Sequence, residues 1–287
     1  MLSSSTATTN IGVPELPEVE TVMQALKPHL IGEKFTAINT YTSKLRTPLD
    51  IVDRPELLNQ AIIKLWRRAK YIIIELKNNY KLIHHLGMTG SWRIESPSIQ
   101  RQKHDHVEFY LSSGHVLRYN DPRRFGQLII IEPGLNLTEH PLFKKLAPEP
   151  LSKKFDIDWL QMVCKKKSKP IKPLIMDNTM VVGVGNIYAS ESLFRAGINP
   201  NSTAGKISKV RLERLLNSIK EVLEEAIKAG GSTIKDYTSV NGEEGNFSRR
   251  LMVYARTGET CRKCKKAKIR HRVHSGRSTF FCPVCQR

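Results

Sequence analysis

Two closely spaced pairs of cysteines near the C-terminus restrict the fold of this chain more than any other sequence feature. Cys261 and Cys264 form one pair, Cys282 and Cys285 form the other, and 17 residues separate the pairs. This spacing is typical of a zinc site in which each pair makes a tight turn and four thiolates surround the ion. Four thiolates leave no open coordination position, so we predict one structural Zn2+ rather than a catalytic ion. Cys164, the remaining cysteine, is interpreted as an ordinary thiol.

The segment between the outer cysteines is strongly basic. It contains eight Lys or Arg residues and no Asp or Glu, which suits a phosphate-binding surface. The whole chain of 287 residues has 46 Lys or Arg against 27 Asp or Glu, a net charge of +19. Such an excess in a soluble protein indicates a polyanionic partner such as nucleic acid. For the cysteine module alone, a purely structural zinc clip or free thiols are the alternatives.

No membrane segment or export signal is predicted. The apolar runs are far shorter than the ~18 residues that a bilayer span requires. Residues 1–13 have neither the charged region nor the apolar region of a signal peptide and are predicted to be a disordered extension. We therefore expect a cytoplasmic protein with no membrane partner.

Hydrophobic patterning divides the chain into a strand-rich part and a helical part. A helix is predicted to begin near Pro17, with Glu18 and Glu20 as favourable charges in its first turn, and to stop at Gly32. Many short strands at close spacing then favour an antiparallel sandwich or barrel. The predicted strands span residues 35–41, 62–66, 70–76, 81–85, 91–95, 106–111, 115–119 and 126–132.

The helical part follows a proline-containing linker at residues 146–154. Its strongest predicted helix spans residues 208–229, where apolar residues recur at helical spacing and Gly230 ends the pattern. A shorter helix is predicted to end at Gly197, because glycine is the usual residue after a helix C-terminus.

Three shorter motifs leave alternatives open. The sequence GVGN at residues 183–186 precedes a helix, where glycines can admit a phosphate, although an ordinary turn and helix cap is the commoner cause. Five lysines within residues 165–172 form either a solvated face or a phosphate contact. His104 and His106 would share one face of a strand around Asp105, but a third metal ligand at fitting spacing is not evident.

Seven further motifs, together with the cysteine module, resemble one known family. They are PELPEVET (14–21), RRAKY (67–71), HLGMTGS (85–91), KHDHV (103–107), LRYNDPRRFG (117–126), VVGVGNIYASESLFRAGI (181–198) and GGSTIKDY (230–237). In this order they are similar to the bacterial formamidopyrimidine-DNA glycosylases, the Fpg/MutM family of base-excision repair enzymes for oxidised purines. The resemblance extends over residues 14–287.

The resemblance implies an α+β fold in two lobes. An N-terminal antiparallel β-sandwich catalytic domain with flanking helices (14–145) would be joined by the linker (146–154) to a helical helix-two-turns-helix DNA-binding domain (155–255). A β-hairpin zinc finger (256–287) would complete the second lobe. Damaged double-stranded DNA would bind between the lobes of a monomer, so we expect a location with the bacterial nucleoid.

The catalytic residues of that family correspond to Pro14, Glu15, Lys70 and Arg277. The resemblance implies that the N-terminal amine of Pro14 attacks the sugar C1′ and becomes an iminium. Since an α-amine has a pKa of about 8, a useful fraction is neutral at pH 7. Glu15 would protonate the opening sugar, Lys70 would transfer a proton in β-elimination, and Arg277 would assist δ-elimination and phosphate binding. Phosphate neutralisation without proton transfer is the alternative for Lys70 and Arg277.

The resemblance also implies which residues contact DNA. Met88, Arg123 and Phe125 would fill the space left by a flipped-out base, with Arg123 reading the opposite base. The backbone-binding positions are His85, His104, Lys167 and Asn186, and the lesion-covering region contains Lys235 and residues 238–249. Glu191 corresponds to a carboxylate near the site.

One feature departs from the family pattern, because thirteen residues precede Pro14. An internal proline nitrogen is an amide and cannot form the iminium. We therefore expect residues 1–13 to be absent from the active enzyme. Either Val13 stands at a GTG start codon, which is the favoured explanation, or a protease removes the extension.

Other functions fit parts of the sequence. A non-catalytic zinc-containing DNA-binding protein is expected if the N-terminus stays blocked. A pyrimidine-lesion glycosylase of the same superfamily is opposed by the opening PELPEVE and by the complete set of Met88, Arg123 and Phe125. A basic zinc protein that binds RNA fits the composition but does not explain PELPEVE or DPRRFG.

Overall fold

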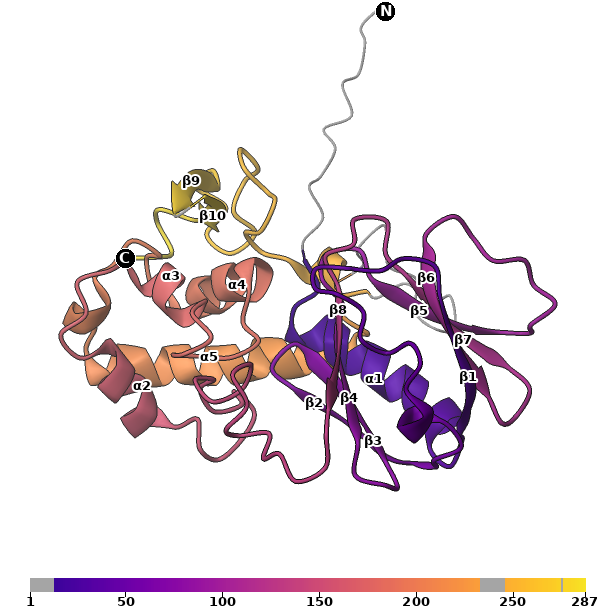
Figure 1. Ribbon diagram of the computed structural model, residues 1–287. Coiled ribbons are helices and arrows are strands. Elements are labelled where there is room, and N and C mark those ends of the chain that lie inside the picture. The colour runs from indigo at the N-terminus through magenta and orange to yellow at the C-terminus, as the bar shows by residue number, and fades with distance from the viewer. Residues whose placement is uncertain (1–12, 233–245, 275) are drawn as a thin grey trace, which may run out of the picture.

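The chain forms two lobes, with a small β-hairpin above the second one (Figure 1). The computed structural model describes residues 13–232, 246–274 and 276–287. Residues 1–12 of the expected extension, Lys235 and residues 238–245 of the expected lesion-covering region lie outside the described residues.

Eight strands in the first lobe form two antiparallel four-stranded sheets, which confirms the predicted sandwich. The first sheet has the order β1 (Phe35–Thr40), β6 (Asp105–Leu111), β7 (Val116–Asn120), β5 (Ser91–Glu95). The second has the order β2 (Ile62–Arg68), β3 (Tyr71–Leu76), β4 (Lys81–His85), β8 (Gln127–Ile131). Every predicted strand is present, and its ends lie within two residues of the prediction. Buried Trp92, Phe109 and Tyr119 share one core with aliphatic residues of the second sheet.

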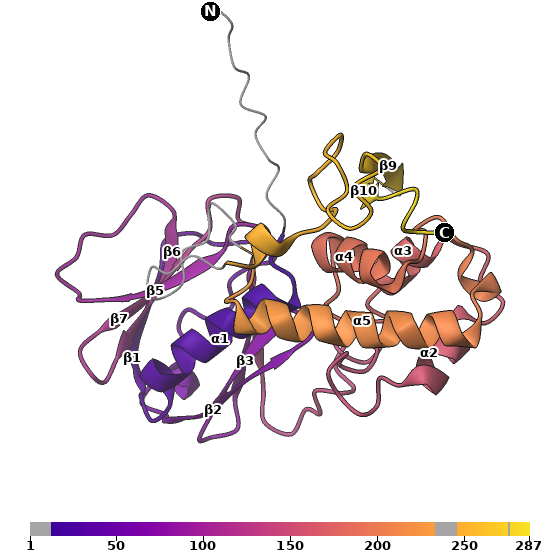
Figure 2. The same cartoon turned by 180° about the vertical axis from the view of Figure 1, so that it is seen from behind.

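Helix α1 (Leu16–Leu30) connects the start of the chain to both lobes. Val19, Val22 and Leu26 pack into the sandwich core. Figure 2 shows α1 beside the end of α5 (Lys209–Lys228), with which it makes contacts. Pro17 stands in the first turn, where its missing N–H leaves no hydrogen bond unmade, and Gly32 follows the helix end with φ of +89°.

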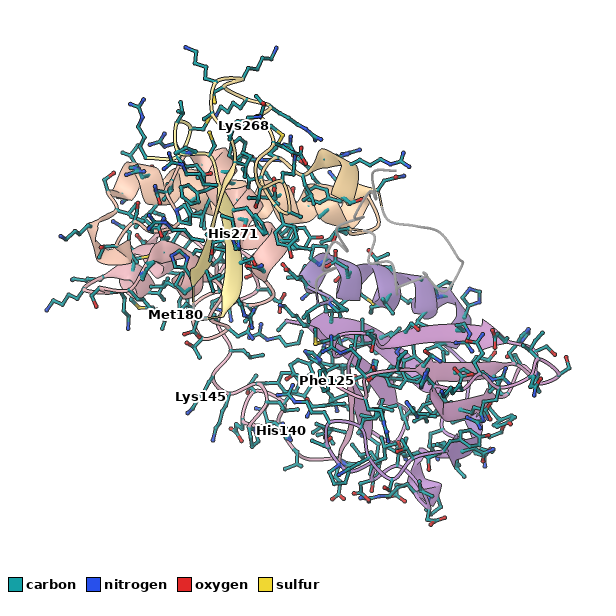
Figure 3. All side chains as sticks on the ribbon, turned by 90° about the horizontal axis from the view of Figure 1, so that it is seen from above. Phe125, His140, Lys145, Met180, Lys268 and His271 are labelled. Carbon is teal, nitrogen blue, oxygen red and sulfur yellow. The ribbon has the colours of Figure 1, made fainter. Side chains whose placement is uncertain are left out.

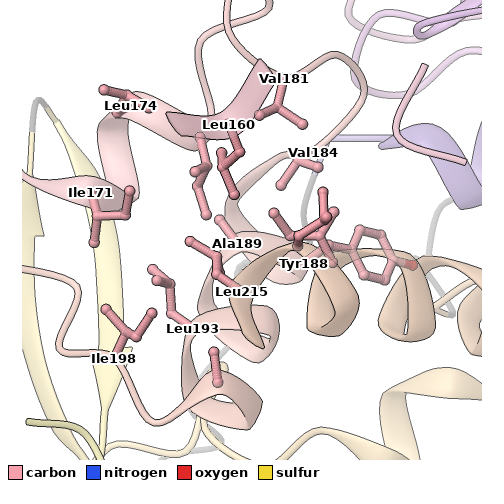
Figure 4. Packing of buried hydrophobic residues seen from close by; sticks show 14 of the residues in the cluster. Leu160, Ile171, Leu174, Val181, Val184, Tyr188, Ala189, Leu193, Ile198 and Leu215 are labelled. Atoms are coloured by element: carbon pink, nitrogen blue, oxygen red, sulfur yellow. The ribbon is translucent and has the colours of Figure 1, made fainter. Parts of the chain in front are cut away.

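The second lobe is built around α5, the helix with the strongest sequence signal. Its apolar stripe, which includes Leu215 and Ile219, packs against α4 (Asn186–Ala196) in one buried cluster (Figure 4). Gly197 ends α4 with φ of +69°, as predicted. The remaining elements are α2 (Ile157–Cys164), α3 (Ile171–Ile175) and the 3-10 turns η1 (Pro55–Leu57) in the first lobe, η2 (Ala204–Lys206) and η3 (Phe247–Arg250).

The linker contributes to the structure of the first lobe. Glu149 accepts a hydrogen bond from the Ala69 N–H (2.6 Å) and forms ion pairs with Arg67 (2.6 Å) and Arg68 (2.7 Å). These contacts hold the turn between β2 and β3, which carries Lys70. The linker therefore braces a predicted site residue in addition to joining the lobes.

The cysteine module ends in an antiparallel hairpin of β9 (Arg270–His274) and β10 (Arg277–Phe281). Gln286 attaches the module to the second lobe. Its side-chain amide donates to the Ile198 carbonyl oxygen (2.9 Å), and its side-chain oxygen accepts from the Cys282 N–H (2.8 Å). None of the helices in the described ranges has the length and apolar character needed to cross a bilayer.

Candidate active site

Pro14 and Glu15 lie where the first lobe meets the start of α4. The Glu15 carboxylate accepts hydrogen bonds from the backbone N–H groups of Gly185 (2.7 Å) and Ile187 (2.9 Å). A Cβ at Gly185 would lie 2.3 Å from the Glu15 carboxyl carbon, so a larger residue would displace this carboxylate. The glycines of the GVGN motif therefore admit a carboxylate of this chain at the start of α4.

Glu15 and Lys70 perturb one another, and Glu15 is buried while Lys70 is half-buried. Glu15 is 3% exposed. Burial raises the pKa of its carboxyl to about 7, although the Lys70 charge and the amide N–H groups act in the opposite direction. Burial also lowers the pKa of the Lys70 amine, against the attraction of Glu15. At neutral pH, Glu15 is therefore divided between both protonation states, as a proton donor and acceptor requires.

Glu18 is a buried residue of the same site, although its position in the sequence indicated only a favourable charge at a helix start. Its carboxylate accepts from the Glu15 N–H (3.0 Å) and from both the N–H and the hydroxyl of Ser232 (2.8 Å each). The Tyr188 hydroxyl also donates to it. Glu18 thus holds the segment around Pro14 against α4 and the end of α5. A Glu three residues after Glu15 fits a capping box, which the sequence alone can indicate. Nothing in the sequence near Glu18 indicates its contacts with the distant Tyr188 and Ser232.

Lys172 differs from the other four lysines of its cluster, which are exposed or half-buried, so the interpretation as a solvated face is wrong for this one residue. It is 1% exposed, and its amine donates to the Asn186 side-chain oxygen, to the Ser278 carbonyl oxygen (2.8 Å) and to the Thr279 hydroxyl (2.9 Å). Burial lowers its pKa to about 7. Lys172 therefore connects the start of α4 to the hairpin. In the sequence, the burial of Lys172 is indicated only by its place within the apolar first turn of α3.

Arg277 begins β10 and is exposed. With Lys169, Lys172 and His274 it lines a cavity of ≈ 370 Å³. Asp177 also lines this cavity and pairs with Lys169, so the guanidinium of Arg277 is the group there best suited to an anionic ligand such as a phosphate.

Met88, Arg123 and Phe125 lie on two loops at one end of the sandwich. Residues 86–90 connect β4 to β5, and residues 121–126 connect β7 to β8. Phe125 is 44% exposed, and the guanidinium of Arg123 lies 4.9 Å from its ring centre. Hydropathy alone would place Phe125 in the core, but its side chain is exposed. Figure 3 shows it on the first lobe, separated from the hairpin residue His271 on the second lobe.

The other predicted DNA-contact residues are spread over both lobes. His85 ends β4, and its Nδ1 accepts from the Gly87 N–H (3.0 Å). Burial and the charges of Lys70 and Arg46 lower its pKa to about 4. The half-buried His104 precedes β6, the exposed Lys167 follows α2, and Asn186 begins α4.

The four module cysteines converge on one point. Their Sγ atoms all lie within 4.8 Å of one another, at 3.9 Å for Cys261 and Cys285 and 3.7 Å for Cys264 and Cys282. Four thiolates bound tetrahedrally at ~2.3 Å from a zinc ion lie about 3.8 Å apart, whereas a disulfide requires about 2.05 Å. The arrangement fits a structural metal site, and it is the one cluster of possible metal ligands found among the described residues.

Two further residues have structural roles. The Glu191 carboxylate accepts from the N–H groups of Met252 (2.8 Å), Val253 (2.9 Å) and Tyr254 (2.8 Å), and so anchors the segment that leads into the cysteine module. Cys164 is buried, and burial raises the pKa of its thiol to about 11, as expected for an ordinary thiol.

A buried carboxylate beside a lysine, an exposed aromatic side chain and a basic hairpin with four clustered cysteines are typical of an enzyme site directed at a nucleic acid. Two family models extend this conclusion: the formamidopyrimidine-DNA glycosylase N-terminal domain matches residues 13–128, and the H2TH domain of the same glycosylases matches residues 146–238. The chain belongs to the formamidopyrimidine-DNA glycosylase family, whose members are DNA-repair glycosylases.

Relatives agree with this assignment over nearly the whole chain. The formamidopyrimidine-DNA glycosylase of Klebsiella pneumoniae is 45% identical over 275 residues, which cover 96% of this chain and 100% of the relative. The Lactococcus lactis protein, crystallised as a single-residue mutant with DNA containing Fapy-dG, is 36% identical with a TM-score of 0.88, covering 96% of this chain and 100% of that one. The MutM protein of Thermus thermophilus is 35% identical with a TM-score of 0.83, covering 95% and 98% of the two chains.

Proposed function

We propose that this protein is a bifunctional DNA glycosylase and AP lyase that removes oxidised purines, such as 8-oxoguanine and formamidopyrimidines, from duplex DNA. The observation that carries the proposal is the position of Glu15. It follows Pro14 directly, is buried against the start of α4, and has a pKa of about 7. The complex of the Lactococcus lactis relative with DNA containing Fapy-dG supports the substrate class.

In the proposed reaction, the Pro14 nitrogen forms a bond to C1′ as the bond between C1′ and the damaged base breaks, and the proton of the Pro14 amine passes to the departing base. Glu15 then donates its proton to the ring oxygen O4′ as the C1′–O4′ bond breaks, which leaves an iminium between Pro14 and C1′. The iminium withdraws electrons and makes a C2′ proton acidic. Loss of that proton expels the 3′ phosphate, and a second elimination expels the 5′ phosphate.

Lys70 and Arg277 are assigned to the elimination steps. The lowered pKa of Lys70 favours a neutral amine that can accept a proton near the C2′ position. The guanidinium of Arg277 lines the cavity beside Lys172, which suits binding of the departing phosphate.

The reactive form is proposed to begin at Pro14. With Val13 attached, the Pro14 nitrogen is an amide whose lone pair is delocalised into the carbonyl group. The family match beginning at residue 13 supports this start. Whether translation begins there or a protease acts, the chemistry requires a free secondary amine.

DNA is proposed to contact both lobes of a monomer. His85, His104, Lys167 and Asn186 would contact the phosphate backbone, while Met88, Arg123 and Phe125 would enter the duplex; Lys235 is assigned to the lesion-covering segment. The four cysteines would hold one Zn2+, which shapes the hairpin that presents Arg277. The proposed domain limits are 14–145, 155–255 and 256–287, and the proposed location is the bacterial cytoplasm with the nucleoid.

Oxidised pyrimidines are a second candidate substrate class. The Lactococcus lactis relative has also been crystallised with DNA containing an oxidised pyrimidine. A non-catalytic DNA-binding function would apply only to a form in which the Pro14 nitrogen stays acylated.

Borohydride trapping tests the proposal, because reduction of the iminium leaves a stable covalent bond between protein and DNA. The substrate is a duplex with 8-oxoguanine opposite cytosine, and the 287-residue chain is compared with a chain that begins at Pro14. We expect only the Pro14 form to be trapped and to cleave the strand. Trapping of both forms would show that another amine reacts or that the extension is removed. Binding by both forms without trapping would favour the non-catalytic function.

A further inference from the structure

The two loops that carry Met88, Arg123 and Phe125 pack directly against each other. We call residues 86–90 and 121–126 the wedge loops. Gly87 has φ of +69°, and a Cβ there would lie 2.4 Å from the carbonyl carbon of Phe125. The backbones therefore touch with no side chain between them, so a movement of one loop must involve the other.

A buried carboxylate lies beneath this contact. Asp121 is 0% exposed, and its side chain accepts from the Thr89 hydroxyl (2.6 Å), the Gly126 N–H (2.8 Å) and the Tyr119 hydroxyl (3.2 Å). All three donors are uncharged. Burying a carboxylate on such partners costs free energy that only well-made hydrogen bonds offset. The arrangement therefore depends on every one of these three donors.

Thr89 is the residue through which this network joins the two loops. Its hydroxyl donates to Asp121 (2.6 Å) and accepts from the Arg123 N–H (3.2 Å). Thr89 directly follows Met88, and Arg123 stacks on Phe125. One hydroxyl thus connects the loop of the first wedge residue to the loop of the other two.

We propose that Thr89 is a positioning residue that makes Met88, Arg123 and Phe125 enter the duplex as one rigid unit. The coupling is proposed to set how strongly the protein distinguishes the base opposite the lesion, because Arg123 can read that base only from a defined position. Separating base pairs is costly, and loops that moved independently would lose additional conformational entropy on insertion. This inference rests on the proposed function for the role of the three side chains.

The test compares Thr89→Val, which keeps the shape and removes the hydroxyl, with Thr89→Ser, which keeps the hydroxyl. A duplex with 2-aminopurine opposite a tetrahydrofuran site reports wedge insertion by fluorescence in stopped flow. We expect insertion by Thr89→Val to be about tenfold slower, as for the loss of one buried hydrogen bond, and Thr89→Ser to stay close to the unchanged protein.

A second measurement uses the chain that begins at Pro14. The ratio of 8-oxoguanine excision opposite cytosine to that opposite adenine should fall about tenfold in Thr89→Val and stay nearly unchanged in Thr89→Ser. Trapping on single-stranded DNA with a preformed abasic site needs no wedge and should be equal in all three proteins.

Equal insertion rates and equal opposite-base ratios in Thr89→Val and the unchanged protein would overturn the proposal. So would equal losses in both variants accompanied by a lower melting temperature, because that pattern indicates a role in folding alone. Failure of the unchanged protein to be trapped on any DNA would instead overturn the proposed function. The fluorescence measurement would still test the coupling in that case, since it requires binding without chemistry.

Discussion

The cysteine module and the Glu15 site are constructed in opposite ways. All four possible metal ligands of the module come from residues 261–285. The Glu15 site combines the start of α1, the turn before β3 and the start of α4, and its hydrogen bonds join residues 170 and 172 positions apart. The first can form wherever its own short segment folds, whereas the second exists only when both lobes are in place. Perturbing one should therefore leave the other largely intact.

Removing the metal from the module should produce the largest effect. Structural zinc in small modules contributes about 10–16 kcal/mol of apparent binding free energy, so a chelator or Cys264→Ser should unfold β9 and β10 and displace Arg277. Hydrogen exchange should show lost protection in the hairpin and unchanged protection in β3 and β4. Elemental analysis of the untreated protein should find one zinc per chain. Equal loss of protection in both lobes would contradict the local character of the module.

Glu15→Gln should produce the next largest effect, and it should act on chemistry. Loss of a general acid lowers a rate by about 10²–10⁴-fold, so formation of the iminium that borohydride traps should slow by that amount in the Pro14 form at pH 7. For the unchanged enzyme, iminium formation should be fastest between about pH 7 and 8, because the protonated fraction of Glu15 falls above pH 7 while the neutral fraction of the Pro14 amine increases up to about pH 8. The exposed Glu139 provides the control, since Glu139→Gln removes the same charge. A normal rate in Glu15→Gln would remove Glu15 from the mechanism.

Glu15 should also leave a signature in the pH dependence of stability. Its pKa rises from 4.5 when unfolded to about 7 when folded, so the folded state binds more protons between these values. Stability should therefore decrease as pH rises from 4.5 to 7, by about 3 kcal/mol relative to Glu15→Gln, since one pKa unit corresponds to about 1.4 kcal/mol. Urea unfolding of both proteins across this range provides the comparison. Parallel curves would mean that burial does not perturb Glu15.

Lys172→Met should produce the smallest of these effects. Lys172 links the cysteine module to the start of α4, where Glu15 is bound. Losing the amine leaves the Thr279 hydroxyl and the Ser278 carbonyl without this partner, which costs about 1–3 kcal/mol. Lys169→Met is the matched control, because the exposed pair of Lys169 with Asp177 at 3.3 Å contributes about 0–1 kcal/mol. Thermal unfolding should separate the two variants, and equal melting temperatures would show that the buried amine does not join the hairpin to the second lobe.

Patterns that depend on near neighbours were predictable from the sequence. The cysteine spacing, the eight strands and the apolar stripe of α5 each reflect residues that meet within one short segment. Ordered motifs of a known family also pointed to Pro14 and Glu15, while the roles assigned to them stay predictions. The wedge loops show the limit of this reasoning, because Phe125 is apolar and yet 44% exposed.

Tertiary structure decided which charged groups are buried and which partners they have. Sequence patterns treated Lys172 as one of five similar lysines and Glu18 as a helix-start charge, but Lys172 reaches Thr279, 107 residues away, and Glu18 reaches Ser232, 214 residues away. The cost of burying a charge depends on the partners that surround it, and those partners come from elements that only the folded chain brings together. The sequence by itself therefore determined the cysteine module and the order of the elements. The fold decided which charged side chains are buried and which distant groups they bind.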